Sequence, residues 1–319
     1  MKKVLILFGK SNWRKSRPFD NKDYQYSYEF FYSLCKKSGI QMYRASYQWY
    51  DYKKHLFKYA WIYEGKNANW KRVRNIKPDL IYDKTKARME VYYKKELIGE
   101  KYRFINNLEF TQLIDNKLTI SLLFEKWSKK SWLVGNKKDL TEALTKTRTN
   151  KIVIKPLLES GGKDVWIINK KDALKKIRIH QPCLAQEFID SSAGVPDFSK
   201  GTHDLRLVFI NNRLIYAYTR EPAKGKLLTN LAQGGSLTII PAKKIPRSVL
   251  PVMKYANRIF ETFSPRIFSI DLMFDRGKRP WVVELNSMPG LYFTPTEKPY
   301  MLRMYKKLLE IFKRELNVL

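Results

Sequence analysis

The sequence predicts an α/β protein built from two or three lobes. Three observations predict this class: a short apolar run, VLILF, near the start of the chain; several pairs of apolar segments joined by turn residues in its second half; and apolar positions at helical spacing close to its end. A chain of 319 residues with 44% hydrophobic content is long enough to bury large cores.

Other features of the sequence limit the kind of protein that it encodes. No apolar run approaches the ~18 residues of a membrane-spanning helix. The stretch VLILFG after Met1 and two lysines is too short for a secretory signal. Cys35 and Cys183 lie far apart and give neither a disulfide framework nor a metal motif. We therefore expect a cytoplasmic protein with no membrane span.

The first 110 residues or so predict a small lobe with a parallel sheet. VLILF is typical of a buried strand, residues 22 to 38 predict a helix, and IQMYRASY and PDLIYDKT predict further strands. The segment from 11 to 24 follows the first strand, where α/β folds place ligand loops. Its basic residues could hold a substrate carboxylate, although solvated loop charges are commoner; they are Arg14, Lys15 and Arg17.

The segment KIVIKPLLESGGKDVWII, residues 151 to 168, predicts two strands joined by a glycine-containing turn. Lys155 lies near the end of the first strand. Ser160, Gly161 and Gly162 form a loop whose backbone amides could approach phosphate oxygens. This loop is neither a Walker loop nor a G-x-G-x-x-G turn. It could equally be an ordinary hairpin turn beside a surface lysine.

Two further segments predict strands that carry polar residues. CLAQEFID, which begins at Cys183, predicts an apolar strand with a polar end. HDLRLVFINNRLIYAYTR predicts a hairpin around Asn211-Asn212. Asp204 and Arg206 lie on one face of this hairpin, because alternate residues of a strand share a face.

The segment FSIDLMFDRGKRPWVVELN predicts a third hairpin, whose turn is RGKR. We expect Asp275 to pair with Pro280 beside the turn. The same register sets Asp271 opposite Glu284, and Asn286 on the same face as Glu284. Opposed carboxylates in apolar strands destabilise a hairpin unless they bind a cation, and hard oxygen ligands point to magnesium. The alternative is that both acids face solvent and pair with Arg or Lys.

The last residues of the chain predict a helix with one apolar face. Apolar residues recur there at helical spacing. We expect them to pack on the core rather than to bind a membrane; they are Tyr305, Leu308, Leu309, Phe312 and Leu316.

The order of these segments resembles the ATP-grasp superfamily, and within it the RimK-like and glutathione-synthetase-like carboxylate-amine ligases. The matching stretch runs from about Arg103 to Gly290 and includes VIKPLLESGGKDV, QEFI, HDLR, TREPAKGKLLTNLAQGG, FSIDLMF and VVELNSMPGL. The resemblance implies an ATP-grasp fold with an N-terminal parallel-sheet α/β lobe at 1–110. It also implies a lid subdomain at 111–188 and a metal-binding subdomain at 189–319.

The resemblance implies a role for each site residue. Lys117 and Lys155 would contact the nucleotide phosphates, under a loop of Ser160, Gly161 and Gly162. Arg206 and Arg220 would face the transferred phosphoryl group or acyl phosphate. The adenine base would be recognised, largely through backbone groups, by Gln186, Glu187, Phe188 and Ile189. Asp204 matches a nucleotide-contacting position, and Asn230 matches the Asn after the long loop. The metal ligands are matched by Asp271, Glu284 and Asn286.

The chain departs from the family pattern at several positions. SSAGVPDFSKGT, which precedes His203, is an apparent insertion. His203 itself is interpreted as a structural or substrate-contacting residue. Asp164 stands where the loop commonly has another Gly. Three positions that are often basic in related ligases are not basic here, which argues against a glutamate-type acidic substrate; they are Glu221, Leu228 and Gln233.

The net charge of +32, from 62 basic and 30 acidic residues, is the strongest compositional anomaly. Such a charge attracts nucleic acid, anionic surfaces or acidic substrates. WKRVRNIK interleaves aromatic and basic residues as single-strand binders do. Lysine is nevertheless spread over the whole chain, which favours a compositional bias over a nucleic-acid-binding face.

We therefore predict an ATP- and magnesium-dependent ligase that forms an acyl phosphate and lets an amine displace the phosphate. It would use two Mg²⁺ ions, which Mn²⁺ could replace, and small-molecule or peptide carboxylates and amines. One alternative is an ATP-grasp-type kinase of a polyanionic small molecule. Another is a nucleic-acid or anionic-surface binding protein with a vestigial nucleotide site. The sequence leaves the oligomeric state open.

Overall fold

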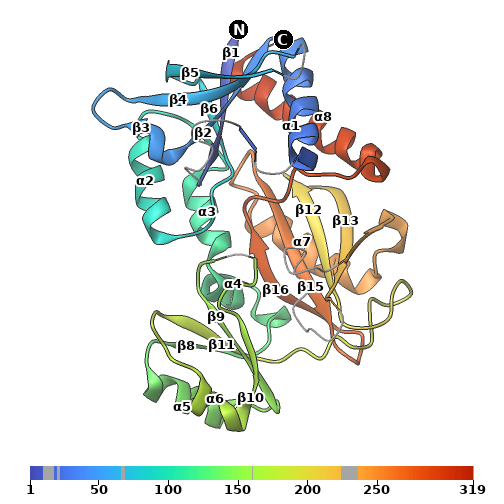
Figure 1. Cartoon of the computed structure of the whole chain (residues 1–319). Coiled ribbons are helices and arrows are strands. Elements are labelled where there is room, and N and C mark those ends of the chain that lie inside the picture. Colours follow the sequence, from blue (N-terminus) through green and yellow to red (C-terminus); the bar gives the residue numbers. More distant parts are fainter. Residues whose placement is uncertain (10–17, 20–21, 66–68, 160, 224–235, 319) are drawn as a thin grey trace. The chain divides into compact units, whose positions relative to one another are not determined.

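The computed structural model describes residues 1–9, 18–19, 22–65, 69–159, 161–223 and 236–318 (Figure 1). Contacts between residues divide the chain into two compact units. Unit 1 contains Met1–Phe110, Phe263–Ile267 and Met288–Leu319, and unit 2 contains Thr111–Thr262 and Phe268–Ser287. The division into three subdomains at 110 and 188 stays a prediction.

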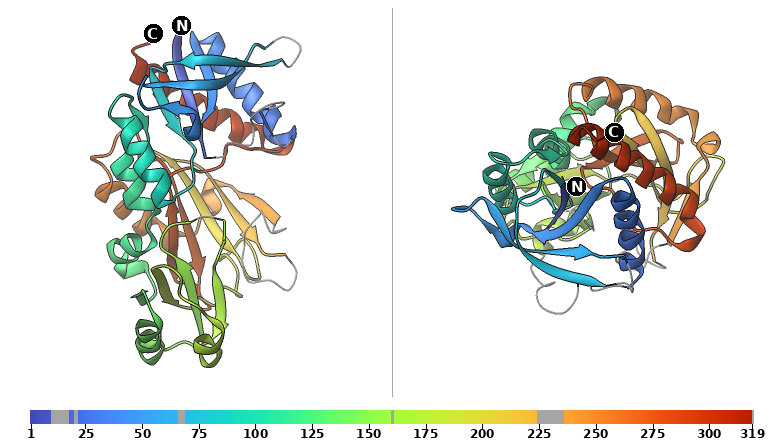
Figure 2. Two further views of the ribbon diagram at one scale, coloured as in Figure 1. Left: turned by 60° about the vertical axis from the view of Figure 1, so that its left-hand side comes forward. Right: turned by 90° about the horizontal axis from the view of Figure 1, so that it is seen from above.

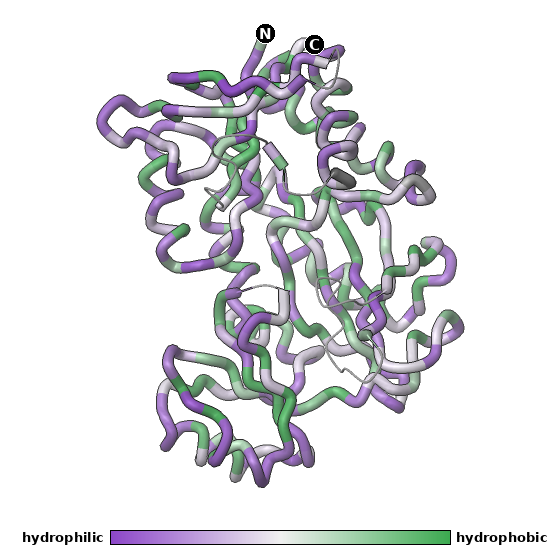
Figure 3. Tube along the Cα trace, in the orientation of Figure 1, coloured by the Kyte–Doolittle hydropathy of each residue, from purple (hydrophilic) through white to green (hydrophobic). Residues whose placement is uncertain are grey.

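Unit 1 is built on a mixed sheet with the strand order β3-β4-β2-β1-β6-β7, in which β5 also pairs with β4. The strands β2, β1, β6 and β7 run parallel, as predicted, and antiparallel strands extend the sheet beside β2. Val4 to Leu7 of β1 are fully buried and form a hydrophobic stretch in Figure 3. The strands are β1 Lys2–Phe8, β2 Ile40–Ser46, β3 Tyr50–Asp51, β4 Leu56–Tyr63, β5 Trp70–Ile76, β6 Leu80–Asp83 and β7 Phe104–Ile105.

The helices of unit 1 cover this sheet with apolar faces. The helix predicted at 22 to 38 is α1, and the C-terminal stripe lies on α8, where Leu309 alone of the five predicted residues is only half-buried. Phe31 contacts the rings of Tyr305 and Phe312, with ring centres 4.8 and 6.0 Å apart. The helices are α1 Lys22–Lys37, α2 Met89–Gly99 and α8 Lys298–Leu316, with short 3-10 helices at Tyr47–Trp49 and Pro295–Glu297.

Unit 2 contains two antiparallel sheets. The first has the order β10-β9-β11-β8, and one of its faces packs on α5 and α6 (Figure 2). The second has the order β14-β13-β12-β15-β16. The strands are β8 Ser131–Val134, β9 Lys151–Pro156, β10 Trp166–Asn169, β11 Cys183–Glu187, β12 Asp204–Ile210, β13 Arg213–Glu221, β14 Ser236–Ile240, β15 Ile267–Phe274 and β16 Pro280–Asn286.

The helices associated with unit 2 are short. They are α3 Leu108–Asp115, which begins in unit 1, α4 Lys117–Leu123, α5 Lys137–Lys146, α6 Lys170–Lys176 and α7 Leu250–Ile259, with 3-10 helices at Glu125–Trp127, Ala242–Lys244 and Arg247–Val249. Asn116 caps α4 by accepting hydrogen bonds from the backbone N–H groups of Leu118 and Thr119. This cap fixes the start of α4 at Lys117, one of the predicted site residues.

The three predicted hairpins are present, but the expected register at the turn of the third is wrong. Phe274, rather than Asp275, pairs with Pro280. Asp275 instead closes the turn, because its carboxylate accepts hydrogen bonds from the Arg279 N–H and the Trp281 indole at 3.0 and 2.7 Å. A bulge at Val283 then shifts the ladder by one residue, so that Asp271 does face Glu284.

His203 has a structural role at the start of β12. It is fully buried, stacks on Phe274, and its Nδ1 lies 3.1 Å from the carbonyl oxygens of both Ser191 and Gly201. Burial lowers the pKa of His203 and favours the neutral ring, and the contacts with the two carbonyl groups only partly oppose this effect. The residue thereby fastens the apparent insertion, 191–202, to the second sheet.

None of the helices in the described part of the chain is both long enough and apolar enough to cross a membrane.

We predict that Lys95→Met destabilises unit 1. Lys95 and Asp83 form an ion pair at 2.6 Å, with side chains only 1% and 6% exposed, so the substitution leaves a buried carboxylate without its cation. The free energy of unfolding should fall by about 3 kcal/mol. Urea unfolding followed by circular dichroism measures the change.

The matched control is Lys94→Met on the same helix. Lys94 pairs with Glu90 at the surface, so its loss should cost less than about 1 kcal/mol. Equal losses in the two variants would contradict a special role for the buried pair.

Candidate functional site

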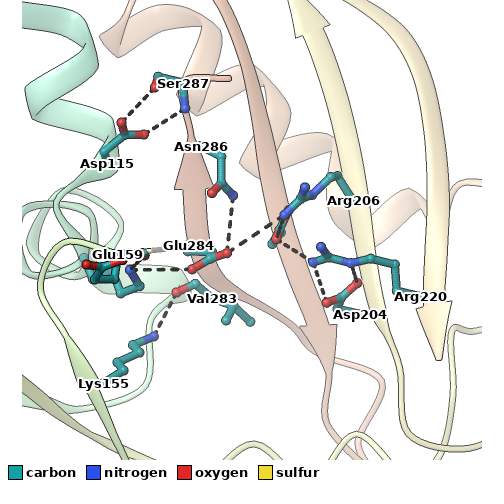
Figure 4. A network of polar contacts seen from close by, with 12 residues as sticks. Asp115, Lys155, Glu159, Asp204, Arg206, Arg220, Val283, Glu284, Asn286 and Ser287 are labelled. Carbon is teal, nitrogen blue, oxygen red and sulfur yellow. Dashed lines mark hydrogen bonds and ion pairs between the residues drawn. The ribbon is translucent and has the colours of Figure 1, made fainter. Parts of the chain in front are cut away.

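Residues from both sheets of unit 2 and from α4 meet in one polar network (Figure 4). The second sheet contributes charged residues from β12, β13, β15 and β16. The first sheet contributes Lys155 from β9 and Gln186 from β11. Most of the predicted site residues that the structure describes lie in this network or directly beside it.

A buried set of two arginines and two aspartates forms the centre of the network. Arg206 binds both carboxylate oxygens of Asp271, at 2.6 and 2.5 Å. Arg220 binds both oxygens of Asp204, at 2.8 and 2.6 Å, and also donates to Asp271 at 2.7 Å. The ladder explains the second pair, because Asp204 lies directly opposite Arg220. The predicted metal ligand Asp271 is therefore held by both of the predicted catalytic arginines.

Burial and charge act on Asp271 in opposite directions. Its side chain is 2% exposed, and burial alone would raise its pKa. The positive charges of Arg206 and Arg220, and the hydrogen bonds that they donate, nevertheless hold the pKa below the usual value of 3.8. Asp271 is therefore a carboxylate, the form that binds a cation. The alternative prediction was that both acids face solvent and pair with Arg or Lys. For Asp271 the solvent-facing position is wrong, because the side chain is buried, but the pairing with arginine is present.

Glu284 and Asn286 form the second part of the network. Glu284 Oε2 lies 3.8 Å from Lys117 Nζ, and its Oε1 lies 3.9 Å from Arg206 Nη2. The Asn286 amide nitrogen donates to Glu284 Oε1 at 3.4 Å, which confirms that the two residues share a face. This orientation leaves the amide oxygen of Asn286 as its candidate metal-ligating atom.

Asp115 fixes the end of β16 and was not predicted as a site residue. Its two carboxylate oxygens accept hydrogen bonds from the Ser287 N–H and hydroxyl, each at 2.8 Å. Ser287 follows Asn286 directly, so this contact positions the Asn286 backbone. The only sequence signal for it is an acidic residue at the end of an apolar helix, which is too common to single out.

The two predicted lysines are buried beside Glu284. Lys155 Nζ donates to the Gln186 side chain at 2.9 Å and to the carbonyl of Val283 at 3.0 Å. Burial lowers the pKa of Lys155 to about 8, and the charge of Glu284 only partly opposes this effect. Lys117 Nζ donates to the carbonyl of Glu159 at 2.6 Å. Both ammonium groups are thus held by uncharged acceptors next to one carboxylate.

The loop that follows β9 has the backbone of a glycine-rich turn. Gly161 and Gly162 have φ angles of 80° and 69°, which glycine adopts freely. Asp164, at the position where the family commonly has Gly, also takes a left-handed φ of 55°. Aspartate tolerates this conformation better than most residues, so the substitution keeps the shape of the loop. Ser160 lies outside the described residues.

At the end of β11 and just after it, several hydrogen-bonding groups already have partners within the protein. The side chain of Glu187 accepts from the Arg148 N–H at 2.9 Å, and the Glu187 N–H donates to the carbonyl of Lys130 at 3.0 Å. The Phe188 N–H donates to the Thr149 hydroxyl at 3.2 Å. Ile189 follows and is buried. A base could therefore contact the carbonyl groups of this segment more readily than these two N–H groups.

The first sheet has an apolar face that sequence reasoning missed. Val134, Ile152, Ile154, Cys183 and Ala185 point into the core formed with α5 and α6, so the alternate residues of these strands point to the other face. Cross-strand pairing places these alternate residues together; they are Ser131, Leu133, Val153, Lys155, Ile167, Leu184 and Gln186. Leu133 is 51% exposed, and the face as a whole places apolar side chains beside a buried lysine.

Asn230 lies outside the described residues, as do Arg14, Lys15, Arg17, Leu228 and Gln233. Among the residues that the structure does describe, no three His, Cys, Asp or Glu side chains cluster as metal ligands. The predicted set does not require such a cluster, because it combines two carboxylates with one amide. Oxygen donors of this kind fit Mg²⁺. A bound ion would compete with Arg206 and Arg220 for the oxygens of Asp271.

A family model for the RimK-like ATP-grasp domain matches residues 115–311, more than half of the chain. A probable alpha-L-glutamate ligase of Shewanella halifaxensis (strain HAW-EB4) is 30% identical over 114 residues, which are 35% of this chain and 21% of that protein. A second probable alpha-L-glutamate ligase, from Xanthomonas oryzae pv. oryzae (strain MAFF 311018), is 32% identical over 109 residues, 34% of this chain and 32% of that protein. The chain thus spans only a fifth to a third of the length of these curated relatives.

Solved structures share the fold over nearly the whole chain. The D-cycloserine synthetase DcsG superposes with a TM-score of 0.66 at 13% identity, covering 96% of this chain and 99% of that one. The RimK domain protein ATP-grasp from Sphaerobacter thermophilus DSM 20745 gives 0.63 at 12% identity, covering 96% and 98%. The fold is therefore the predicted ATP-grasp fold, and the chain belongs to the RimK-like ATP-grasp family.

Proposed function

We propose that this chain is an ATP- and magnesium-dependent ligase that joins a carboxylate to an amine through an acyl phosphate. The observation that carries the proposal is the single network in which Lys117, Lys155, Arg206 and Arg220 surround Glu284 and Asp271. Phosphoryl transfer requires mainly positioning and charge stabilisation, and this network supplies both without a protein nucleophile.

The nucleotide would lie against the first sheet of unit 2. Its base would pack on the apolar face that contains Leu133, Val153 and Ile167. Lys155 of the same face and Lys117 of α4 would bind the phosphates. The amides of the loop at Gly161 and Gly162 could approach the same phosphates because neither residue has a Cβ.

Asp271, Glu284 and Asn286 would hold magnesium. The ion would neutralise phosphate charge and polarise the transferred group. A pair of ions, and replacement by Mn²⁺, stay predictions from the resemblance. Asp115 would act as a positioning residue, because it fixes the backbone next to Asn286 through Ser287.

The arginines would act on the acyl phosphate. A substrate carboxylate oxygen would attack the γ-phosphorus and release ADP, and the amine would then attack the acyl carbon and release phosphate. Guanidinium groups bind such oxygens in pairs. Arg206 and Arg220 hold Asp271 here, so cation binding to Asp271 would free their N–H groups for the substrate.

We propose small-molecule or peptide carboxylates and amines as the substrates, without identifying particular compounds. The family match supports the ligase over the kinase of a polyanion and over the nucleic-acid or anionic-surface binding protein. Glutamate ligase is the name of the relatives, yet Glu221 stands in this chain where related ligases are often basic. The cytoplasmic location stays a prediction from the sequence.

We predict that Glu284→Gln weakens binding of the magnesium–ATP complex about tenfold, or about 1.4 kcal/mol, because it removes one of the two charges from the metal ligands. Calorimetry with Mg²⁺ and with a chelator measures the effect. ATP alone should bind no more weakly to the variant, because a negative charge near the phosphates has been lost.

The control for this variant is Glu142→Gln, which removes an exposed charge from α5 in the same unit. It should bind as the unmodified chain does. Unchanged affinity of Glu284→Gln for the magnesium complex would count against the metal site.

We also predict that ATP affinity falls as the pH rises above about 8. Lys155 is protonated below that pH in the free protein and loses its charge above it, since burial has lowered its pKa from 10.5 to about 8. The dissociation constant should rise by about tenfold per pH unit beyond this point.

Lys155→Arg and Lys155→Met serve as matched variants for this titration. Arginine keeps its charge and methionine has none, so the affinity of each should be independent of pH between 7 and 9. A pH-independent affinity of the unmodified chain would contradict the role of Lys155 as a phosphate-binding cation.

A further inference from the structure

We infer that Ser131 is a specificity-determining residue for the base of the nucleotide, because it fixes the orientation of the Gln186 side-chain amide. The inference rests on the proposed function. Ser131 of β8 lies directly opposite Gln186 of β11, and β9, which carries Lys155, is the neighbour of β11 on its other side (Figure 1). Gln186 and Lys155 are each only 4% exposed.

The side-chain amide of Gln186 has one orientation that suits both of its neighbours. Its oxygen and nitrogen have nearly the same shape, so hydrogen bonds decide which way the amide faces. The Lys155 ammonium group can only donate, and it lies 2.9 Å from Gln186 Oε1. The Gln186 amide nitrogen donates to Ser131 Oγ at 2.8 Å. The reversed amide would set two donors, its NH₂ group and the ammonium group, against each other.

The hydroxyl of Ser131 is oriented in its turn by the backbone. Ser131 Oγ donates to the carbonyl oxygen of Lys129 at 2.9 Å. A hydroxyl has one hydrogen, so this bond leaves the Ser131 oxygen to accept from Gln186. The donation therefore runs in one direction, from Gln186 through Ser131 to a main-chain carbonyl. The amide oxygen of Gln186 consequently faces away from Ser131.

One row across the first sheet explains what this oxygen would meet. Strand pairing sets Ile167, Val153, Gln186 and Ser131 side by side in that order. A base packed on Val153 and Ile167 would thus lie on the oxygen side of the amide.

The free capacity of the amide oxygen selects the base. An amide oxygen accepts two hydrogen bonds, and within the described residues Lys155 supplies one to Gln186 Oε1. The 6-amino group of adenine can donate the second. The 6-oxo group of guanine or hypoxanthine would instead oppose one acceptor with another. Ser131 thereby favours a 6-aminopurine nucleotide.

Calorimetry of the full chain with the magnesium complexes of ATP and ITP tests the inference. The bases of these triphosphates differ only at and beside position 6, so the ratio of the two affinities cancels effects on phosphates and metal. The unmodified chain should prefer ATP by roughly tenfold or more. Ser131→Ala should lower this preference by about threefold or more, because the amide loses one of its two anchors. Ser131→Thr keeps the hydroxyl and should retain the preference.

Gln186→Glu tests whether Ser131 acts through the amide. A carboxylate presents an acceptor in either orientation, so Ser131→Ala should leave the ATP preference of the Gln186→Glu chain unchanged. The matched control is Ser121→Ala in α4, because the Ser121 hydroxyl also donates to a backbone carbonyl, that of Leu118 at 2.8 Å. This control should keep the full preference for ATP.

The outcomes separate the inference from the proposed function. Equal affinities of the unmodified chain for ATP and ITP, or an unchanged preference in Ser131→Ala, would overturn the inference and leave the proposed function standing. An equal effect of Ser131→Ala in the Gln186→Glu chain would also overturn it, because Ser131 would then act without the amide. A folded chain that binds neither triphosphate would overturn the proposed function and the inference together.

Discussion

The candidate site depends on one buried carboxylate that two arginines compensate. Asp271 lies within the second sheet of unit 2, where an uncompensated charge would be expensive. Arg206 comes from the neighbouring strand β12, and Arg220 comes from β13, which lies one strand further along the sheet. Arg220 in turn binds Asp204 of β12. Three strands are therefore joined by charge as well as by their ladders, and removal of any member would leave another charge buried.

The sequence predicted the fold well because its signals were local. Each of the three hairpins has apolar strands around turn residues, and the order of the segments resembled one superfamily. The facing pair Asp271 and Glu284 also followed from strand pairing. The register beside the turn did not, because the Asp275 side chain closes a longer turn and a bulge compensates for it further along. Neither effect has a signature in the order of apolar and polar residues.

The parts of the site that were missed depend on contacts between distant segments. Asp115 and Ser287 are 172 residues apart, and no periodicity connects them. The apolar face around Leu133 becomes a surface only when four strands pair in the order β10-β9-β11-β8, which differs from their order in the chain. The arginine contacts to Asp271 could not be predicted from the hairpin, because strand pairing within the hairpin places only Glu284 opposite Asp271. Arg206 and Arg220 belong to other strands of the folded sheet. The described residues include neither Ser160 nor Asn230, so their roles stay predictions.

The bulge at Val283 adds one residue to β16, and the carbonyl of this residue binds Lys155 of the first sheet. A regular ladder with one residue fewer could still set Asp271 opposite Glu284, but it would lack the extra carbonyl that holds the Lys155 ammonium group. The register of β16 thus couples the predicted metal ligands, Asp271 and Glu284, to the first sheet through a backbone atom. Insertions and deletions in this strand should accordingly disturb the contact with Lys155 more than changes of residue type at position 283, since this contact uses the main-chain carbonyl of Val283.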